Sequence, residues 1–472
     1  MTPETFGATR NETNNPREIG RRQFLATATT GLTLGFFLPT FTRFGTAAAA
    51  TETQVNTWLQ IGSDESITLT IGSSEMGQGS FSGIAQLLSE DLMVRYERVE
   101  GVQGGPTLAS PAPVGTAINT VGSGVTRSNY WRMRDAAAIA REMLVQAAMN
   151  RIGDPARANY AVADGVITHT PSGAALTYGQ VAADAAALTA PASAPLVPDS
   201  QFRVIGKTVA RLDIPDKVDG SAEYGLDIRL PNMVYAVIKH CPSLGGTLAS
   251  TPPTPSGMIA VVPTKVVAGL GRGAEAVGNV NAVAVVGSNT WDAWQAAKQL
   301  KVSWKLPANA AKMNSAQFLA DAQALVGWGA IPYVAGGANG AGTLYTVEGS
   351  ASVAEPAINA ALTIVEATYS LPYAAHGPME VLNCTVDYVP GVKCDVYAPT
   401  QSAKSVLSLA VTLTGLPASK VAVHTTYLGG GLGRKAELDF VSQAVQVAMV
   451  LGQPVKLMWP REEDFTHDQY RP

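Results

Sequence analysis

Residues 421–459 constrain the fold more than any other stretch, because they follow the order strand, glycine turn, helix, strand. Residues 421–425 alternate apolar and polar side chains, as a strand requires. Residues 436–451 place apolar side chains on one helical face, and Gly452 is a typical helix end. Residues 455–459 then alternate again. The pattern predicts a chain of the α+β class, with mixed α/β units built from strands that lead through turns into helices.

The turn at residues 429–433 contains four glycines in five positions. Glycine leaves out the side chain, so backbone N–H groups of such a turn can approach a ligand closely. The spacing matches neither of the usual phosphate-binding motifs, G-x-x-x-x-G-K-[ST] and G-x-G-x-x-G. From the turn alone, a tight corner packed under a helix is an equally good interpretation.

Two further turns of small and polar residues also lead into predicted helices. Residues 72–79 (GSSEMGQG) precede apolar positions of helical spacing up to Leu92, and residues 120–128 precede an alanine-rich helix at 133–152. Each turn alone is most often only a turn. Three of them together favour one polar or anionic ligand held by helix N-termini.

Composition excludes some functions. The chain has 472 residues, 15% of them charged, and a net charge of −4, so a basic nucleic-acid-binding groove is not expected. The length predicts about three domains. The cysteines, Cys241, Cys384 and Cys394, form no C-x-x-C pair, so no zinc or iron–sulfur site is expected in this chain. We expect each cysteine to be a small buried side chain. The sequence does not decide whether Cys384 and Cys394 form a disulfide.

The N-terminus resembles an export signal. Gly20-Arg21-Arg22-Gln23-Phe24-Leu25 precedes an apolar run and the small residues 47–50, an arrangement typical of twin-arginine signals. The alternative is a membrane anchor, but several threonines make the run short and weakly apolar. Residues 1–50 are therefore predicted to be a disordered leader and signal. The protein is expected to be periplasmic, and a partner is expected to provide any membrane association.

The rest of the chain divides by composition into three segments, 54–190, 202–305 and 340–472, with an Ala/Pro/Ser-rich linker at 186–201. Nothing closes the sheet after the strand that begins at Val455, which predicts a continuation that this chain lacks. Smaller predictions are a hairpin-type turn at Asp219-Gly220, strands at 234–238, 283–286, 301–304 and 362–369, a helix at 290–300 and loops at 306–350.

Seven motifs resemble the molybdenum hydroxylases of the xanthine oxidase and aldehyde oxidase family. They are EMGQG, VGSGVTRSNYW, GKTVARLDIPDKVDGSAEYGLDIRLPNMVYA, AAHGPMEVLNCTV, YAPTQ, GGGLGRK and WPREEDF. EMGQG here precedes the GKTVARLDIPDKVDG module. That order, with the export signal, resembles the large subunits of isoquinoline 1-oxidoreductase-type enzymes and of aldehyde dehydrogenases from acetic acid bacteria. The resemblance covers residues 54–472. It implies a multi-domain molybdopterin-binding subunit with an α/β hammerhead-like module at 202–305 and the first part of the main cofactor domain at 340–472.

The cofactor that the resemblance implies is molybdenum on a molybdopterin, in the cytosine dinucleotide form. Oriented neutral dipoles can hold such an anionic group. The family has glutamine where this chain has Ala374, and many relatives have phenylalanine at Leu432. The cofactor-binding residues that the resemblance implies are Gly77, Gln78, Gly79, Ser123, Gly124, Val125, Thr126, Gly430, Gly431, Leu432, Gly433 and Arg434.

His376 and Glu380 have the spacing of one helical turn, which invites a metal-ligand interpretation. Two such residues make a poor metal site, so a structural role that ties a strand end to the glycine turn is preferred, and no metal ligand is assigned. His240 and His424 are interpreted as packing or surface residues.

The resemblance implies oxidation of an aldehyde to a carboxylic acid with oxygen from water. Hydroxylation of an N-heterocycle and a non-catalytic exported scaffold are the alternatives. The family's catalytic base, a glutamate, has no matching segment here, so the catalytic residues are unknown and a second chain carrying the C-terminal half is expected. Electrons would pass to a partner subunit with [2Fe–2S] clusters, and from there to a cytochrome c subunit.

Overall fold

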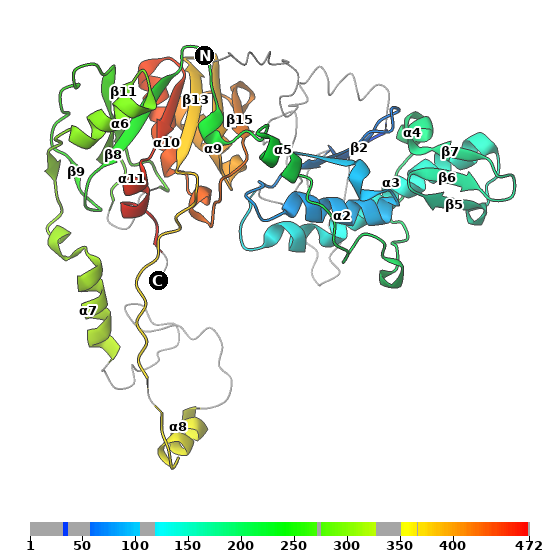
Figure 1. The fold of residues 1–472 in the computed structure, drawn as a ribbon, viewed down its shortest axis with the longest axis horizontal. Coiled ribbons are helices and arrows are strands. Elements are labelled where there is room, and N and C mark those ends of the chain that lie inside the picture. Colours follow the sequence, from blue (N-terminus) through cyan, green and yellow to red (C-terminus); the bar gives the residue numbers. More distant parts are fainter. Residues whose placement is uncertain are drawn as a thin grey trace, which may run out of the picture.

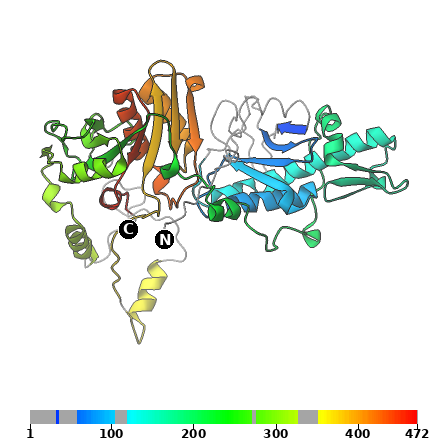
Figure 2. The same cartoon turned by 45° about the horizontal axis from the view of Figure 1, so that its top comes forward.

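The computed structural model describes residues 32–35, 57–103, 119–270, 275–326, 351–365 and 367–470 (Figure 1). Most of the leader and export-signal prediction lies outside these residues. Two large hydrophobic cores divide the described chain. One core buries side chains from residues 59–185 and the other from residues 234–459. The two bodies follow one another along the longest axis of the molecule (Figures 1 and 2). The predicted α+β class is confirmed.

The first body joins a four-stranded sheet to two long helices that pack on each other. The helix that follows EMGQG is confirmed, whereas the alanine-rich helix begins at Gly124, nine residues earlier than predicted. A small three-stranded sheet and a capped helix complete the body. Its elements are β1 (Leu32–Gly35), β2 (Thr57–Ile61), β3 (Ile67–Ile71), β4 (Val99–Gln103), α2 (Ser80–Leu92), α3 (Gly124–Ile152), β5 (Tyr160–Ala163), β6 (Val166–His169), β7 (Ala175–Thr177) and α4 (Tyr178–Ala186).

The second body is a seven-stranded mixed sheet in the order β10-β11-β8-β16-β13-β14-β15. Segments 202–305 and 340–472 both contribute strands, because β8 pairs in parallel with β16 and places Val234 beside Val455. Side chains alternate between the faces: Ile238 enters the core shared with α9 and α10, whereas Val237 packs in the cluster that includes α6. The elements are β8 (Val234–His240), β10 (Ala260–Lys265), β11 (Val280–Gly287), α6 (Thr290–Gln299), β13 (Asn383–Val389), β14 (Lys393–Ala398), α9 (Ala403–Thr414), β15 (Val421–Thr425), α10 (Asp439–Leu451), β16 (Val455–Met458) and α11 (Arg461–Thr466).

The hairpin turn predicted at Asp219-Gly220 is wrong. These residues end helix α5 (Ile214–Asp219), which has a proline in its first turn and Gly220 as its C-cap with φ 84°. A left-handed glycine ends helices as readily as it makes turns, so the dipeptide alone cannot decide between the two.

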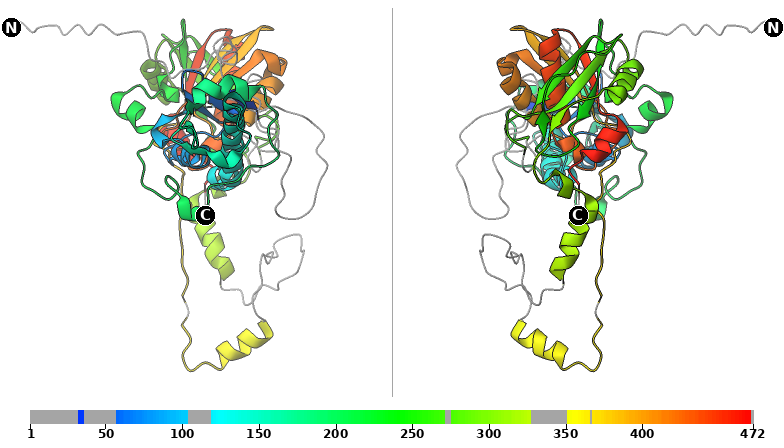
Figure 3. Two further views of the ribbon diagram at one scale, coloured as in Figure 1. Left: turned by 90° about the vertical axis from the view of Figure 1, so that its right-hand side faces the viewer. Right: turned by 90° about the vertical axis from the view of Figure 1, so that its left-hand side faces the viewer.

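Two other strand predictions also need correction. The strand predicted at 301–304 is reduced to β12 (Trp304–Lys305), which pairs with β9 (Thr247–Leu248). No strand forms at 362–365 or 367–369. The predicted loop region contains α7 (Ser315–Val326), and α7 and α8 (Ala351–Asn359) both project away from the second body (Figure 3).

The three cysteines are free and buried. Cys384 and Cys394 lie on the paired strands β13 and β14, and burial raises the pKa of Cys394 to about 12. Such thiols are unreactive packing groups, as expected. Among the described residues, none of the helices combines the length and the apolar character needed to cross a membrane.

Candidate functional site

The glycine turn follows β15 and leads through a short 3-10 helix, η7 (Arg434–Ala436), into α10. Gly430 and Gly433 have φ of 86° and 107°, which glycine adopts without strain. Leu432 also has a positive φ, 56°, and its side chain is 68% exposed. A leucine held in this conformation is unusual, and such strain gathers at functional sites.

A buried carboxylate holds the glycine turn from beneath. Glu380 Oε2 accepts hydrogen bonds from the Gly429 N–H at 3.0 Å and from Lys435 Nζ at 2.6 Å. Glu380 Oε1 accepts from the Leu226 N–H at 3.3 Å and from Asn383 Nδ2 at 3.2 Å. A Cβ at Gly429 would lie 2.5 Å from Glu380 Cβ, so this close approach requires glycine. Burial lowers the pKa of Lys435, and the Glu380 charge opposes that shift.

Arg434, predicted to bind the cofactor, directs its side chain into the core. Its guanidinium donates to both carboxylate oxygens of Asp439 at 3.0 and 2.8 Å and lies 5.2 Å from the centre of the Trp459 ring. Nε also lies 3.1 Å from Asp468 Oδ1, an ion pair whose angle is poor for a hydrogen bond. Because the side chain is fully buried among protein groups, only the backbone of Arg434 stays at the turn.

His376 and Glu380 have separate partners and do not converge on one point. The backbone N–H of His376 donates to Asp468, and His376 Nδ1 lies 2.9 Å from Asp468 Oδ1. Glu380 faces Lys435 instead. The structure therefore supports the structural role for both residues.

The EMGQG turn is closed by its own glutamate. Glu75 Oε1 accepts hydrogen bonds from the N–H groups of Gly77 at 2.9 Å and Gly79 at 3.0 Å. Glu75 Oε2 accepts from the Phe81 N–H at 3.2 Å. The Phe81 N–H is one of the donors that the N-terminus of α2 leaves open, the N–H groups of Gly77 and Gly79 belong to the turn before it, and a carboxylate satisfies all three well. The assignment of Gly77 and Gly79 to the cofactor stays a prediction, and in this structure their N–H groups are bonded to Glu75.

Gln78 is exposed, but its amide is also used inside the turn. Gln78 Oε1 accepts from the Met76 N–H at 2.7 Å, and Nε2 donates to the Ser74 carbonyl at 2.9 Å. A ligand would have to displace one of these bonds to reach the amide.

The third turn precedes α3. Gly122 and Ser123 have φ of 59° and 54°, and the Ser123 side chain does not cap the helix. Ser123 and Thr126 are exposed, whereas Val125 is buried. In α2 the Phe81 N–H is bonded to Glu75, whereas no described side chain is bonded to the first N–H donors of α3. In the described part of the chain, the buried Asn119 Oδ1 next to this turn also has no hydrogen-bond partner.

Gln401 joins the third turn to the glycine turn. Its side chain donates to the Thr120 carbonyl at 2.6 Å and accepts from the Gly433 N–H at 3.0 Å. Its backbone carbonyl accepts from the Thr120 N–H at 2.8 Å. Gln401 is buried in the YAPTQ motif, to which the sequence reasoning gave no role. An amide directly after a buried strand is the signal that could have identified it.

The EMGQG turn meets the other two at the same place. Thr120 Oγ1 accepts from the Ser74 N–H at 2.8 Å, and the Leu428 N–H donates to the Glu75 carbonyl at 3.2 Å. A Cβ at Gly431 would lie 2.8 Å from Met76 Sδ. The three turns, distant in the sequence, thus form one connected cluster between the two bodies.

Another group of side chains, His240, Glu463 and His467, places its potential ligand atoms within 4.8 Å of one another. A hydrogen-bond chain argues against a metal there. Trp459 Nε1 donates to Gln443 Oε1 at 2.8 Å, which turns Gln443 Nε2 toward His240 Nε2 at 2.9 Å. His240 then carries its proton on Nδ1 and donates it to Glu463 Oε2 at 2.8 Å. The group is accounted for as an internal hydrogen-bond network.

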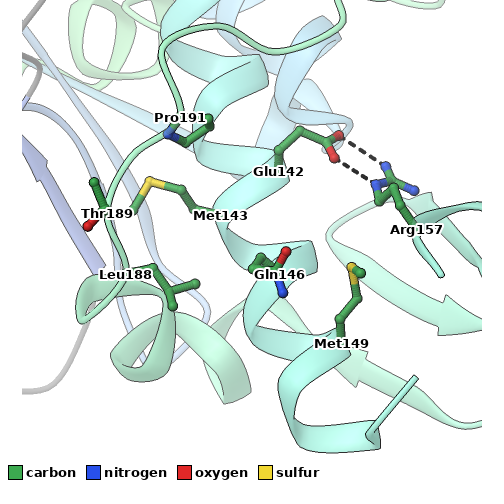
Figure 4. Close-up of a pocket in the computed structure, with 8 residues that line it drawn as sticks. All are labelled: Glu142, Met143, Gln146, Met149, Arg157, Leu188, Thr189 and Pro191. Atoms are coloured by element: carbon green, nitrogen blue, oxygen red, sulfur yellow. Dashed lines mark hydrogen bonds and ion pairs between the residues drawn. The ribbon is translucent and has the colours of Figure 1, made fainter. Parts of the chain in front are cut away.

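A cavity of about 300 Å³ lies elsewhere, along the middle of α3 (Figure 4). Met143, Met149 and Leu188 line it, and the ion pair between Glu142 and Arg157 forms one wall. Glu142 is 18 residues beyond the start of α3, or about 27 Å along the helix at about 1.5 Å per residue. This cavity is therefore separate from the three turns.

Two family models match the chain. Both describe a molybdopterin cofactor-binding domain, one over residues 15–218 and the other over residues 341–472. Together they contain all three turns.

Curated relatives are similar over most of the chain. The chain is 26% identical to isoquinoline 1-oxidoreductase subunit beta of Brevundimonas diminuta, over 88% of this chain and 55% of that protein. It is 25% identical to a protein of Gluconacetobacter polyoxogenes named membrane-bound aldehyde dehydrogenase (pyrroloquinoline-quinone), over 88% of this chain and 51% of that protein. The chain thus spans about half the length of these relatives. Quinoline 2-oxidoreductase from Pseudomonas putida 86 is a similar solved structure, with a TM-score of 0.39 and 20% identity over 55% of this chain and 35% of that one.

Proposed function

We propose that this chain, which belongs to the molybdopterin-binding large subunits of the xanthine oxidase family of molybdenum hydroxylases, binds one molybdopterin at its three turns and serves the oxidation of an aldehyde to a carboxylic acid. The observation that carries the proposal is the convergence of the turns through Thr120, Gln401 and the backbone of Glu75. The residues fit an anionic group with many acceptors, because Ser123 does not cap the first N–H donors of α3. Asn119 Oδ1, which has no protein partner among the described residues, would accept from a donor on the same ligand.

The chain's own residues would divide the binding between them. The N–H groups at Val125 and Thr126 begin α3 and would bind an anionic part of the cofactor, which we take to be the phosphates of the cytosine dinucleotide form. The backbone of residues 430–433 would face the metal end, and Leu432 would border the substrate. When bound, the cofactor supplies a metal that activates water and accepts an electron pair.

Arg434 and Lys435 act from below the glycine turn, not on the ligand. Their charges are neutralised by Asp439 and Glu380, so the turn is held rigid without presenting a free cation. The backbone N–H groups of residues 430–433 would be neutral donors to the ligand, and the charges of Arg434 and Lys435 are paired on the core side of the turn. This arrangement would keep titratable protons away from the reacting atoms.

The substrate, partners and location complete the proposal. An aldehyde is the first choice, and the isoquinoline-type relative supports an N-heterocycle as the alternative. We infer a [2Fe–2S] partner subunit, because the three cysteines of this chain are buried and suit no cluster. A cytochrome c subunit would follow it. Periplasmic location rests on Arg21 and Arg22.

The test is to purify the chain with the polypeptides encoded beside it and to measure molybdenum by mass spectrometry and pterin by fluorescence. About one molybdenum per chain is expected, with turnover of short aldehydes. A folded, metal-free and pterin-free complex would exclude the proposal. Turnover of isoquinoline but not of aldehydes would select the alternative substrate, and a loaded complex without turnover of either would favour a scaffold.

A further inference from the structure

The extended segment between α8 and His376 exposes a row of apolar side chains. Val365, Tyr369 and Leu371 are each more than 80% exposed. Figures 1 and 3 show this segment running from α8 back to the second body, outside both cores. Soluble proteins rarely expose so many large apolar groups in one stretch, and such patches mark interaction sites.

The exposed groups follow the period of a β-strand. Every second residue from 365 to 373 is apolar, and we call these five side chains the apolar face: Val365, Ala367, Tyr369, Leu371 and Tyr373. The opposite side carries Thr368 and Ser370. Alternation of β-branched and aromatic residues with polar ones is typical of a strand with one buried face.

This extended segment is not paired with any strand among the described residues. No backbone hydrogen bond connects residues 362–365 or 367–373 to another described element. The one ring contact is Tyr373 with Phe318 of α7, at 6.3 Å between ring centres. Unpaired edges with apolar faces are avoided in complete proteins, so this segment is suited to receive a strand from elsewhere.

The segment leads directly into the site. His376 and Glu380 follow it, and the Glu380 N–H donates to the Gly429 carbonyl at 2.9 Å. The backbone of Met379 lies beside the glycine turn, since a Cβ on Gly430 would lie 3.7 Å from the Met379 nitrogen, and the Met379 side chain is 89% exposed. The segment that carries the apolar face therefore ends beside the glycine turn.

We propose that the apolar face binds a β-strand from the half of the large subunit that this chain does not span. The chain covers 55% and 51% of two relatives, so a segment of the required size exists in proteins of this kind. Addition of a strand supplies backbone hydrogen bonds to residues 367–371, and its side chains cover the apolar face. The proposal rests on the proposed function for the identity of the partner, and it brings that partner to the edge of the glycine turn.

The test uses this chain co-expressed with the polypeptide, in frame or from an adjacent gene, that aligns with the second half of the isoquinoline-type relative. Tyr369→Lys with Leu371→Lys alters the apolar face, and Thr368→Lys with Ser370→Lys is the control on the opposite side. We expect the first pair to weaken co-purification about tenfold or more and the control to retain it. Hydrogen exchange of amides 367–371 should slow only in the complex.

Equal co-purification of both double variants, or unchanged hydrogen exchange, would overturn the inference. A dimer of this chain alone that Tyr369→Lys dissociates would overturn it in favour of a second copy. The readouts also separate the two proposals. A complex that assembles through this segment without molybdenum contradicts the proposed function alone, and a molybdenum-loaded complex that ignores the substitutions contradicts the strand addition alone.

Discussion

Two glycine-rich turns meet at the site, and each is organised by a buried carboxylate, but the two carboxylates differ in origin. Glu75 lies within its own turn and binds N–H groups two to six residues away. Glu380 precedes Gly429 by 49 residues and reaches it from another strand end. The EMGQG turn can therefore form from local sequence, whereas the glycine turn depends on the folded second body.

The cations that pair with Glu75 and Glu380 differ in how far they are exposed to solvent. Glu75 lies 3.3 Å from Arg211, whose side chain is one-third exposed. Glu380 pairs with Lys435, which is fully buried. A buried charge that loses its partner costs far more than an exposed one, so equivalent substitutions should have unequal effects at the two turns.

The largest effect is expected for Lys435→Met. It leaves the buried Glu380 charge without a cation and should lower the free energy of unfolding by about 3–5 kcal/mol. Chemical denaturation measures this, with Lys404→Met on the exposed side of α9 as the control. A loss below about 1 kcal/mol would show that amide donors alone stabilise Glu380, and the contrast between the turns would fail.

Gln401→Leu should follow. It leaves the buried Thr120 carbonyl unpaired, at about 1–3 kcal/mol, and the half-buried Gly433 N–H loses its partner as well. It should also reduce the molybdenum content of the purified complex, because two of the three turns lose their connection. Gln146→Leu, exposed on α3, is the matched control. Full retention of molybdenum by the Gln401 variant would contradict the role given to the cluster.

Glu75→Gln is expected to cost about 1–3 kcal/mol. The amide keeps one oxygen for the N–H groups of Gly77 and Gly79 but turns an NH₂ group toward other donors. Melting temperature is the measurement, with the exposed Glu97→Gln for comparison. If this variant were less stable than Lys435→Met, local hydrogen bonds would matter more than buried charge pairing.

The smallest effect is expected for Arg211→Ala, about 1 kcal/mol or less at neutral pH. Burial disfavours the charged form of Asp213, but hydrogen bonds from Arg211 and Lys217 outweigh it and lower its pKa to about 2. The ionised form therefore stabilises the fold above about pH 4, and this contribution is lost as the pH falls toward 2. Without Arg211 the pKa rises, so the free energy of unfolding should fall less steeply between pH 4 and pH 2. Acid titration of unfolding measures this, with the exposed Arg132→Ala as control, which should keep the steeper slope.

The contrast between the turns also explains what the sequence could predict. Helix α2, strand β15 and helix α10 follow local periodicity, and the structure contains all three. The hydrogen bonds from the N–H groups of Gly77 and Gly79 to Glu75 could have been predicted from the sequence, since the glutamate belongs to the same motif. The roles of Gln401 and Lys435 were not, because each depends on a partner more than 30 residues away.

The segment at 362–369 shows a different limit. Its alternation predicted a strand, and the residues have the required pattern, but a strand also needs a neighbour to accept its hydrogen bonds. Within the described residues that neighbour does not exist, so an appropriate local pattern produced no sheet.

The parallel pairing of β8 with β16 has a consequence for synthesis. The two partners are separated by about 220 residues, and at about 5–20 residues per second the ribosome needs roughly 11–44 seconds to make the second one after the first. During that interval the edge of β8 that later pairs with β16 stands open to any other extended chain, and the edge of β13 joins it once β13 has been made. A cell that produces this protein must shield those edges while translation proceeds, and slower elongation would lengthen their exposure to aggregation.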